Sequence, residues 1–220
     1  MRADIINEWL IGNGLPELDG NAENLLSRYQ QRVLEVNKYM NLTAITGDED
    51  FAVKHFIDSF TLLPWICGGG CPSVIDIGTG AGFPGIPLKI VCPNIKLTLV
   101  DSLRKRVFFL RETLDMLGIS DVECIHARAE EIANKDGYRE NYDICMARAV
   151  ARLDRLVGYA MPLLKPVAAG FPGGLLLAMK GPDVSEEIKS AKLNYPVETR
   201  KFEIAEGMTH TVIAVRKVQA

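Results

Sequence analysis

Three glycines and one carboxylate in the middle of the chain have the spacing of a nucleotide-binding turn. Gly78, Gly80 and Gly82 follow a mostly apolar run at 74–77, and Asp101 ends the next such run, 21 positions after Gly80. Glycine tolerates positive φ and lets a ligand approach the backbone, while a carboxylate accepts hydrogen bonds from both hydroxyls of a ribose. The pattern predicts a site for a cofactor that contains adenosine.

The position of the third glycine favours one class of cofactor. The dinucleotide pattern G-x-G-x-x-G would need glycine at position 83, where the chain has Phe83, so the turn is G-x-G-x-G instead. The chain also lacks the Gly-Lys-Ser/Thr sequence of a phosphate-binding loop. A G-x-G-x-G turn preceded by Asp76 resembles the first motif of class I methyltransferases, which implies S-adenosylmethionine as the cofactor. A turn that only packs a helix against a strand is the alternative interpretation.

Short apolar runs alternate with helical stretches from residue 72 onward. The runs lie at 73–77, 95–100, 122–126, 142–147 and 175–179. Strands that alternate with helices predict a parallel sheet, and two final runs at 199–205 and 210–216, joined by a short connection, predict an antiparallel hairpin. We therefore predict an α/β fold of the class I, Rossmann-like methyltransferase type, with a seven-stranded, mostly parallel sheet and a C-terminal antiparallel hairpin.

The first 71 residues have helical periodicity. Apolar side chains recur three and four positions apart at Leu25, Leu26, Tyr29, Val33 and Val36, and again at Val53, Phe56, Ile57 and Phe60. The segment 41–48 between them is rich in residues that favour a turn. We predict an N-terminal helical extension at 1–71, which either holds RNA or caps the sheet, and an S-adenosylmethionine-binding methyltransferase core at 72–220.

Composition and charge limit the possible functions. The 220-residue chain is 48% hydrophobic and 24% charged, as is typical of a globular protein, and its formal net charge is −3. Such a chain does not coat nucleic acid nonspecifically, so any RNA contact must be local. The polar start of the chain and the lack of an apolar run of about 18 residues predict a cytoplasmic protein that does not bind a membrane.

The five cysteines predict no disulfide framework. Cys124 and Cys145 lie inside apolar runs, where buried free thiols are expected. Cys67 and Cys71, with His55 nearby in the sequence, are a weak signal for a zinc site because a second pair of ligands is missing. We therefore predict no metal.

Motifs spread in order along nearly the whole chain resemble the RsmG family, also called GidB. They are Asn37–Ile45, His55–Ser59, Asp76–Leu88, Asp101–Arg106, Arg128–Glu131, Ala147–Val150 and Met179–Gly181. The resemblance implies methylation of guanine N7 in the 530 loop of bacterial 16S ribosomal RNA. We expect 16S ribosomal RNA or the small ribosomal subunit as the partner, and no obligate protein partner.

The residues agree with this chemistry. Guanine N7 carries an in-plane lone pair, so it accepts a methyl group without first losing a proton, and alignment of the reactants supplies most of the rate. The sequence has no conspicuous nucleophile or catalytic base, and we name no catalytic residue. The Asn/Asp-Pro-Pro-Tyr motif of amino-group methyltransferases is absent, since the fourth apolar run ends in Ala147-Arg148-Ala149-Val150. A small-molecule or protein acceptor and a non-catalytic assembly factor that binds S-adenosylmethionine stay open as alternatives.

The expected cofactor contacts follow from the turn and from the resemblance. They are Gly78, Gly80 and Phe83 at the methionine end, Asp101 at the ribose, and Ala129 and Glu130 at the adenine. The adenine contacts are carried over from the family pattern. A charge that favours the start of a helix is the alternative role for Glu130.

Four basic residues are candidates for substrate contact: Arg148, Lys180, Arg104 and Arg106. Arg148 ends the fourth apolar run, where ligands bind in open parallel sheets, so it contacts cofactor or substrate, with a surface salt bridge as the alternative. Lys180 has a similar place after the fifth run. Arg104 and Arg106 lie beside the apolar stripe of a helix and form either an RNA contact or a solvated face.

One segment departs from the family pattern. Residues 164–174 are longer than the short Lys-Pro-Gly-Gly turn expected before the fifth strand. We expect this loop to lie near the cleft and to affect its shape.

Overall fold

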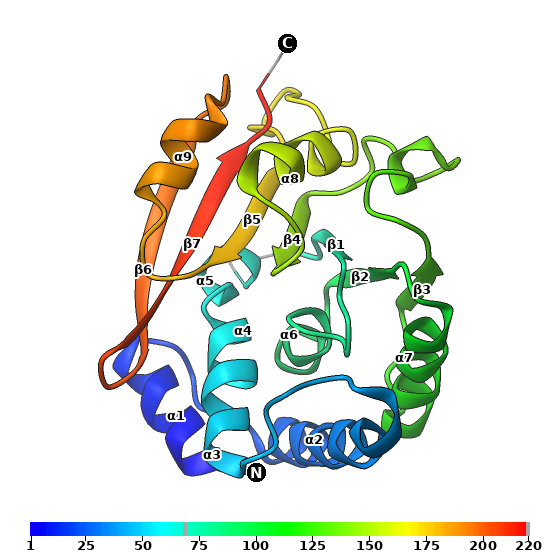
Figure 1. Ribbon diagram of the computed structural model, residues 1–220, viewed down its shortest axis with the longest axis vertical. Helices are drawn as coiled ribbons and strands as arrows, with labels where there is room; N and C mark the ends of the chain where they lie inside the picture. The colour runs from blue at the N-terminus through cyan, green and yellow to red at the C-terminus, as the bar shows by residue number, and fades with distance from the viewer. Residues whose placement is uncertain (68–69, 219–220) are drawn as a thin grey trace.

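A single seven-stranded sheet, in the order β3-β2-β1-β4-β5-β7-β6, runs through the molecule (Figure 1). The computed structural model describes residues 1–67 and 70–218. The parallel strands are β1 (Ser73–Ile77), β2 (Lys96–Asp101), β3 (Val122–His126), β4 (Ile144–Arg148) and β5 (Leu175–Lys180). The hairpin of β6 (Val197–Ala205) and β7 (Met208–Arg216) adds two antiparallel strands. The predicted class I, Rossmann-like fold is confirmed.

The strand order places a crevice at the end of β1. β1 pairs with β2 on one side and with β4 on the other, so the order in which strands are added reverses here. In open parallel sheets, ligands bind at this switch point, beyond the carboxyl ends of the strands. The glycine turn at 78–82 follows β1 directly and therefore lies in the crevice.

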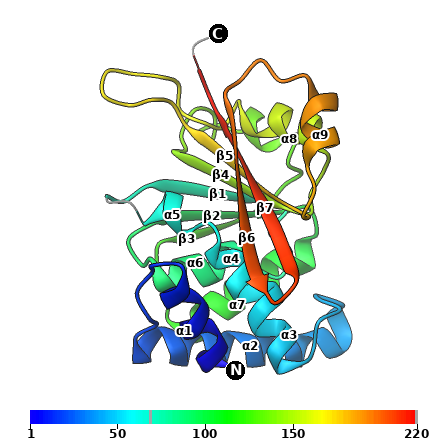
Figure 2. The same cartoon turned by 90° about the vertical axis from the view of Figure 1, so that its left-hand side faces the viewer.

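Helices cover both faces of the sheet (Figure 2). One layer contains α1 (Ala3–Gly12), α2 (Gly20–Met40), α3 (Asp48–Phe51), the π-helix η1 (Ala52–Ile57), α4 (Asp58–Phe60), α5 (Leu63–Ile66), α6 (Gly85–Val91) and α7 (Arg104–Leu117). The other contains the 3₁₀-helix η2 (Ile132–Asn134), α8 (Leu153–Ala160) and α9 (Ser185–Ala191). Successive strand residues alternate between the two cores, Val74 in the first and Ile75 in the second. Among the residues that the structure describes, no helix is both long and apolar enough to cross a membrane.

α2 connects the N-terminal segment to the crevice. The helix begins after Asp19, whose carboxylate accepts a hydrogen bond from the Ala22 N–H at 2.7 Å, and ends at Asn41, which has a left-handed φ of 53°. On its buried face, the Tyr29 hydroxyl donates to the Ala81 carbonyl at 2.7 Å. An N-terminal helix therefore supports the glycine turn directly. Side chains of the N-terminal helices and of the sheet belong to one hydrophobic core. The division of the chain into two parts at residue 72 stays a prediction.

The prediction of no disulfide is wrong. Cys67 and Cys92 form a disulfide, with Cα atoms 6.5 Å apart. Cys67 follows α5 and Cys92 follows α6, and helical periodicity does not reveal which helix ends meet. Cys124 and Cys145 are buried free thiols, as predicted. The disulfide removes Cys67 from the pair with Cys71, and the described residues contain no group of three or more side chains that could hold a metal ion.

The long segment at 164–174 does not lie near the cleft, contrary to expectation. The Ala168 N–H donates to the Phe171 carbonyl at 3.0 Å, and the Gly174 N–H donates to the Lys165 carbonyl at 2.9 Å, so the segment folds back on itself before β5 begins. A segment that directly precedes a parallel strand lies at the amino-terminal edge of the sheet. This loop is therefore on the edge opposite the crevice.

Candidate active site

Hydrogen bonds on both sides hold the turn after β1. Gly78 and Thr79 donate their N–H groups to the Val100 carbonyl, at 2.8 and 3.0 Å. The buried carboxylate of Asp76 accepts from the Thr79 hydroxyl at 2.6 Å and from the Gly85 N–H at 3.0 Å. Burial raises the pKa of Asp76 to about 7, although these two hydrogen bonds act in the opposite direction. The turn is thus fixed by the ends of both β1 and β2.

A side chain at Gly78 and one at Gly80 would have different effects on the turn. Gly78 and Gly80 both have positive φ, 69° and 63°. A Cβ at Gly78 would lie 2.7 Å from a methyl group of Val150, whereas nothing lies within 4 Å of the Cβ position at Gly80. Gly80 therefore borders open space, where a ligand can approach the backbone.

Asp101 lies directly beside the turn, as predicted from its position at the end of β2. Its Oδ2 accepts from the Gly80 N–H at 2.9 Å, and its Oδ1 accepts from the Leu103 N–H at 2.8 Å. A carboxylate can accept about four hydrogen bonds, so lone pairs remain for two ribose hydroxyls. Arg106 Nη1 lies 3.6 Å from Asp101 Oδ2, so this side chain faces the crevice. Its contact with RNA stays a prediction.

The predicted adenine contacts follow the next strand of the sheet. The Ala127 N–H donates to the Asp101 carbonyl at 3.2 Å, which joins the end of β3 to the end of β2. Ala129 is half-buried, and Glu130 is exposed, with a carboxylate oxygen 3.7 Å from Arg128. The glycine turn, Asp101 and the Ala129-Glu130 pair therefore lie at the ends of adjacent strands.

Phe83 lies beneath the turn in an aromatic cluster. Its ring stacks on His55 with centroids 4.2 Å apart, and the rings of Tyr29 and Phe51 lie at 5.2 and 5.8 Å. The Arg148 guanidinium carbon lies 5.2 Å from the centroid of the Phe83 ring, in a cation–π contact. Phe83 is almost fully buried and supports the turn from the side of the N-terminal helices. Its contact with the methionine end of the cofactor stays a prediction.

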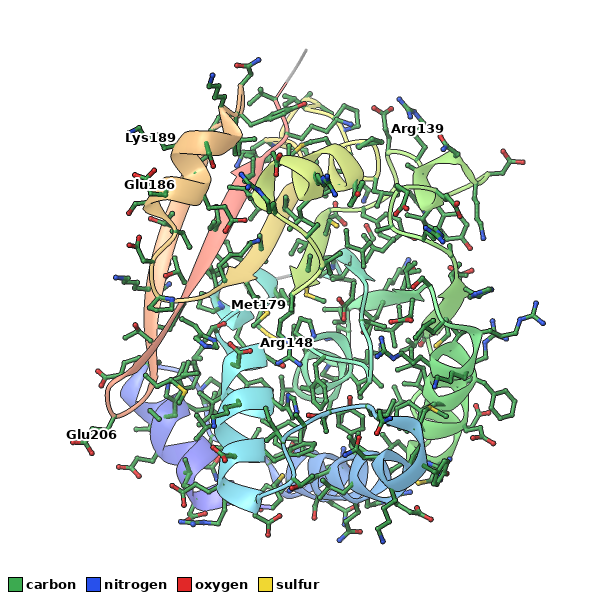
Figure 3. All side chains as sticks on the ribbon, viewed as in Figure 1. Arg139, Arg148, Met179, Glu186, Lys189 and Glu206 are labelled. Atoms are coloured by element: carbon green, nitrogen blue, oxygen red, sulfur yellow. A yellow bond between two sulfur atoms is a disulfide. The ribbon has the colours of Figure 1, made fainter. Side chains whose placement is uncertain are left out.

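Arg148 reaches from the end of β4 toward the helical segment formed by α3, η1 and α4 (Figure 3). Nη1 donates to the Lys54 carbonyl and to Asp58 Oδ2, both at 3.0 Å, and Nη2 donates to His55 Nδ1 at 3.3 Å. Because arginine only donates, the His55 proton is assigned to Nε2, which donates to Thr43 Oγ1 at 2.8 Å. Burial lowers the pKa of His55 to about 3, so its ring is neutral near pH 7. Arg148 thus makes a partly buried ion pair rather than a surface one.

His210 completes this cluster, although no motif in the sequence indicates it. Asp58 Oδ1 accepts a hydrogen bond from His210 Nδ1 at 2.6 Å, while Oδ2 of the same carboxylate binds Arg148. The hydrogen bond with Asp58 raises the pKa of His210. A carboxylate on the buried face of a helix indicates a hidden cationic partner, but Asp58 and His210 are 152 positions apart, so no local pattern links them.

A cavity of about 790 Å³ opens beside the cluster. Its lining includes Lys54, Asp58, Arg148, Met179, Lys180 and His210. The Lys180 ammonium donates to the Ala151 carbonyl at 2.8 Å and to Glu187 Oε1 at 2.7 Å, so one of its three N–H groups is left for a ligand. The structure therefore brings two predicted substrate contacts, Arg148 and Lys180, to one cavity. Arg104 is exposed at the start of α7 and lies outside the lining.

Comparison with known proteins decides the family. Residues 22–211 match the family model GidB, described as rRNA small subunit methyltransferase G. The chain belongs to this family. Two relatives named Ribosomal RNA small subunit methyltransferase G support the assignment. The protein of Alkaliphilus metalliredigens is 40% identical over 224 residues, covering 97% of this chain and 91% of its own, and that of Desulfitobacterium hafniense is 46% identical over 176 residues, covering 80% and 70%.

Solved structures agree with the fold. TrmN from Thermus thermophilus superposes with a TM-score of 0.56 at 20% identity, covering 72% of this chain and 48% of that one. A SAM dependent methyltransferase from Aquifex aeolicus gives a TM-score of 0.56 at 18% identity, covering 77% and 94%. At these identities the likeness concerns the fold alone.

The cofactor of this methyltransferase family is S-adenosylmethionine, and the crevice fits it. Open space borders the backbone at Gly80, and Asp101 keeps free lone pairs beside it, as an adenosine-containing group requires. The loops after β1, β2 and β3 would hold its methionine, ribose and adenine parts in that order.

Proposed function

We propose that this chain methylates guanine N7 in the 530 loop of 16S ribosomal RNA. One observation carries the proposal beyond family membership: the lining of the cavity at the carboxyl ends of β4 and β5 includes the side chains of Lys54, Arg148 and Lys180. Its volume of about 790 Å³ is ample for a nucleobase with its ribose and phosphate. Although Arg148 and Lys180 are paired with Asp58 and Glu187, both keep N–H groups that suit an acceptor-rich ligand such as RNA.

In the proposed reaction, the protein positions the two reactants and does not need to transfer a proton. Bound S-adenosylmethionine would supply a methyl group whose bond to the positively charged sulfur breaks as the lone pair of guanine N7 forms the new bond. No proton is lost, the positive charge passes to the guanine, and S-adenosylhomocysteine is the leaving group. The protein must then hold both reactants in line, with reacting atoms roughly 3–3.5 Å apart. Asp58 and Glu187 fix Arg148 and Lys180 in advance, which lowers the cost of orienting a bound base.

Arg148 is the residue best placed to orient the base. Three of its five N–H groups bond to Lys54, Asp58 and His55, so two remain for an acceptor. Guanine O6 and the phosphate oxygens are acceptors that arginine binds well. An Arg148→Lys variant would lose the planar geometry that bonds Asp58 and the substrate together. We also place the chain in the bacterial cytoplasm, where the small ribosomal subunit is found.

Labelled methyl transfer tests the acceptor. The purified chain is incubated with labelled S-adenosylmethionine and, in parallel, with free 16S ribosomal RNA, the intact small subunit, ribosomal protein without RNA, and a small-molecule extract. The proposal predicts label in 16S RNA in at least one RNA-containing reaction. Label only in protein or in small molecules would replace the RNA acceptor with another one. Cofactor binding without any transfer would favour a non-catalytic assembly factor.

A further inference from the structure

The two most exposed large apolar side chains of the described residues are aromatic. Tyr39 in the last turn of α2 is 70% exposed, and Phe108 in α7 is 61% exposed. Leu103, which precedes α7, is 43% exposed. Single exposed apolar residues are common, whereas exposed rings that gather on one surface mark an interaction site.

The packing of α2 on α7 brings the end of α2 and the start of α7, which carry these residues, to the same side of the molecule (Figure 1). Arg28 donates to the Met116 carbonyl, and Arg32 pairs with Glu112 at 3.1 Å. A step of four residues forward in α2 thus corresponds to four residues backward in α7, so the helices are antiparallel. Continuing this register places the last turn of α2 beside the first turn of α7.

This end of the helix pair adjoins the cofactor crevice. The Leu103 N–H donates to Asp101 Oδ1 at 2.8 Å, so α7 starts at the carboxylate beside the glycine turn. On the α2 side, Asn37 Oδ1 accepts from the Thr43 N–H at 2.9 Å, and the Thr43 hydroxyl contacts His55, which binds Arg148. Both helix ends therefore lead directly into the site.

The surface at the end of α2 and the start of α7 is basic. Lys38, Arg104 and Lys105 are exposed, and within the described residues none of them makes an ion pair. The chain as a whole has a net charge of −3, so this is a local excess of positive charge. Proteins bind single-stranded nucleic acid with cationic side chains along the phosphate backbone and with aromatic rings on which the bases stack.

We propose that Tyr39 and Phe108, flanked by Lys38, Arg104 and Lys105, form a stacking surface for unpaired bases of the RNA substrate. The inference rests on the proposed function and adds to it a second contact outside the cavity. Stacking on this surface holds the RNA while the target base enters the cavity beside Arg148. The surface therefore contributes to RNA affinity and not to cofactor binding.

Binding of a 16S RNA fragment that contains the 530 loop tests the proposal. Tyr39→Ala and Phe108→Ala are each expected to weaken binding at least about fivefold, since one stacked base contributes about that much. The KM for RNA rises in parallel, while kcat at saturating RNA and the Kd for S-adenosylmethionine stay unchanged. Tyr39→Phe and Phe108→Tyr keep a ring and should bind normally. Ile11→Ala removes a comparably exposed apolar side chain, 57% exposed on α1, and serves as the matched control.

A charge variant separates stacking from electrostatics. Lys105→Ala should reduce the slope of log K against log salt by roughly 0.7–1, whereas Tyr39→Ala should leave that slope unchanged. If the parent protein methylates RNA but both alanine variants bind and react like it, the stacking surface is disproved and the proposed function stands. If the alanine variants lose binding to the intact subunit but bind the naked RNA fragment normally, the surface contacts a ribosomal protein instead of RNA, which also overturns the proposal. If the parent protein neither binds nor methylates any RNA, the proposed function itself fails.

Discussion

Asp58 joins three segments that are far apart in the sequence. From α4 its carboxylate accepts hydrogen bonds from Arg148 at the end of β4 and from His210 in β7. Because Asp58 is almost fully buried, the ion pairs must offset a substantial desolvation cost. One carboxylate therefore holds two other side chains of the cavity lining, Arg148 and His210.

We predict that Asp58→Asn lowers the free energy of unfolding by about 3 kcal/mol, because removing one partner of a buried ion pair leaves the other charge uncompensated. Urea unfolding at pH 7 measures the change. Asp50→Asn is the matched control, since Asp50 pairs with Lys54 at 2.5 Å on the surface and its loss should cost less than about 1 kcal/mol. Equal costs for the two variants would contradict the role given to Asp58.

The raised pKa of His210 predicts a pH-dependent contribution to stability. A histidine whose pKa is higher in the folded state stabilises it fully below the unfolded-state pKa of about 6.5, and loses this effect as pH rises through the folded-state value. His55, with its lowered pKa, is neutral in both states above that pH and does not contribute. The difference in unfolding free energy between the parent and His210→Gln should therefore be larger at pH 7 than at pH 9. A constant difference would show that the Asp58 contact does not depend on protonation.

Asp101→Asn should weaken S-adenosylmethionine binding at least about tenfold, because hydrogen bonds to a charged carboxylate contribute about 1.5–3 kcal/mol each. Isothermal titration of the cofactor measures this loss. Asp115→Asn changes an exposed carboxylate in α7, away from the end of β2, and should bind the cofactor normally. Unchanged affinity in Asp101→Asn would mean that the ribose is held elsewhere.

The sequence predicted the positions of the site residues better than their partners. Gly80, Asp101 and Arg148 lie at strand ends as expected, because strand alternation determines which residues end parallel strands. The partner of Arg148 is Asp58, and His210 shares it, because a helix and the terminal hairpin meet at this point. Such contacts depend on how elements pack and have no signal in local spacing.

At the scale of elements, two glycine variants distinguish the effect of backbone strain from the effect of contact with the cofactor. Gly80→Ala and Gly118→Ala both place a methyl group at positive φ, 63° and 70°, with nothing within 4 Å of the new Cβ. Each should lower the free energy of unfolding by about 1–2 kcal/mol through left-handed strain. Only Gly80→Ala should also raise the Kd for S-adenosylmethionine, because its methyl group enters the crevice. Equal Kd values for the two variants would exclude close approach of the cofactor at Gly80.

Elements with a clear period were predictable, and irregular ones were not. The predicted strands agree with the observed ones to within two residues at each end, since alternation between buried faces fixes them. The π-helix η1 is different, because its apolar spacing resembles that of an ordinary helix. The Cys67–Cys92 disulfide and the position of the 164–174 loop depend on which ends of elements come together in space.

At the scale of the whole molecule, the N-terminal helices and the sheet act as one body around the site. Tyr29 and His55 from these helices contact Ala81 and Phe83 of the turn, so the N-terminal segment helps to form the crevice. The family model covers both parts, residues 22–211. Composition alone predicted a globular chain with only local RNA contact, and we propose that this contact lies at the cavity beside Arg148 and Lys180 and at the basic helix ends.

Mapping the methylated nucleotide tests the central claim most directly. Borohydride and aniline cleave an RNA chain at 7-methylguanosine, so primer extension on treated 16S RNA locates the modified base. We predict one new stop in the 530 loop after reaction with S-adenosylmethionine, and no stop with the Asp101→Asn variant at limiting cofactor. Label incorporated into 16S RNA without cleavage in that loop would contradict the assignment of guanine N7 as the acceptor.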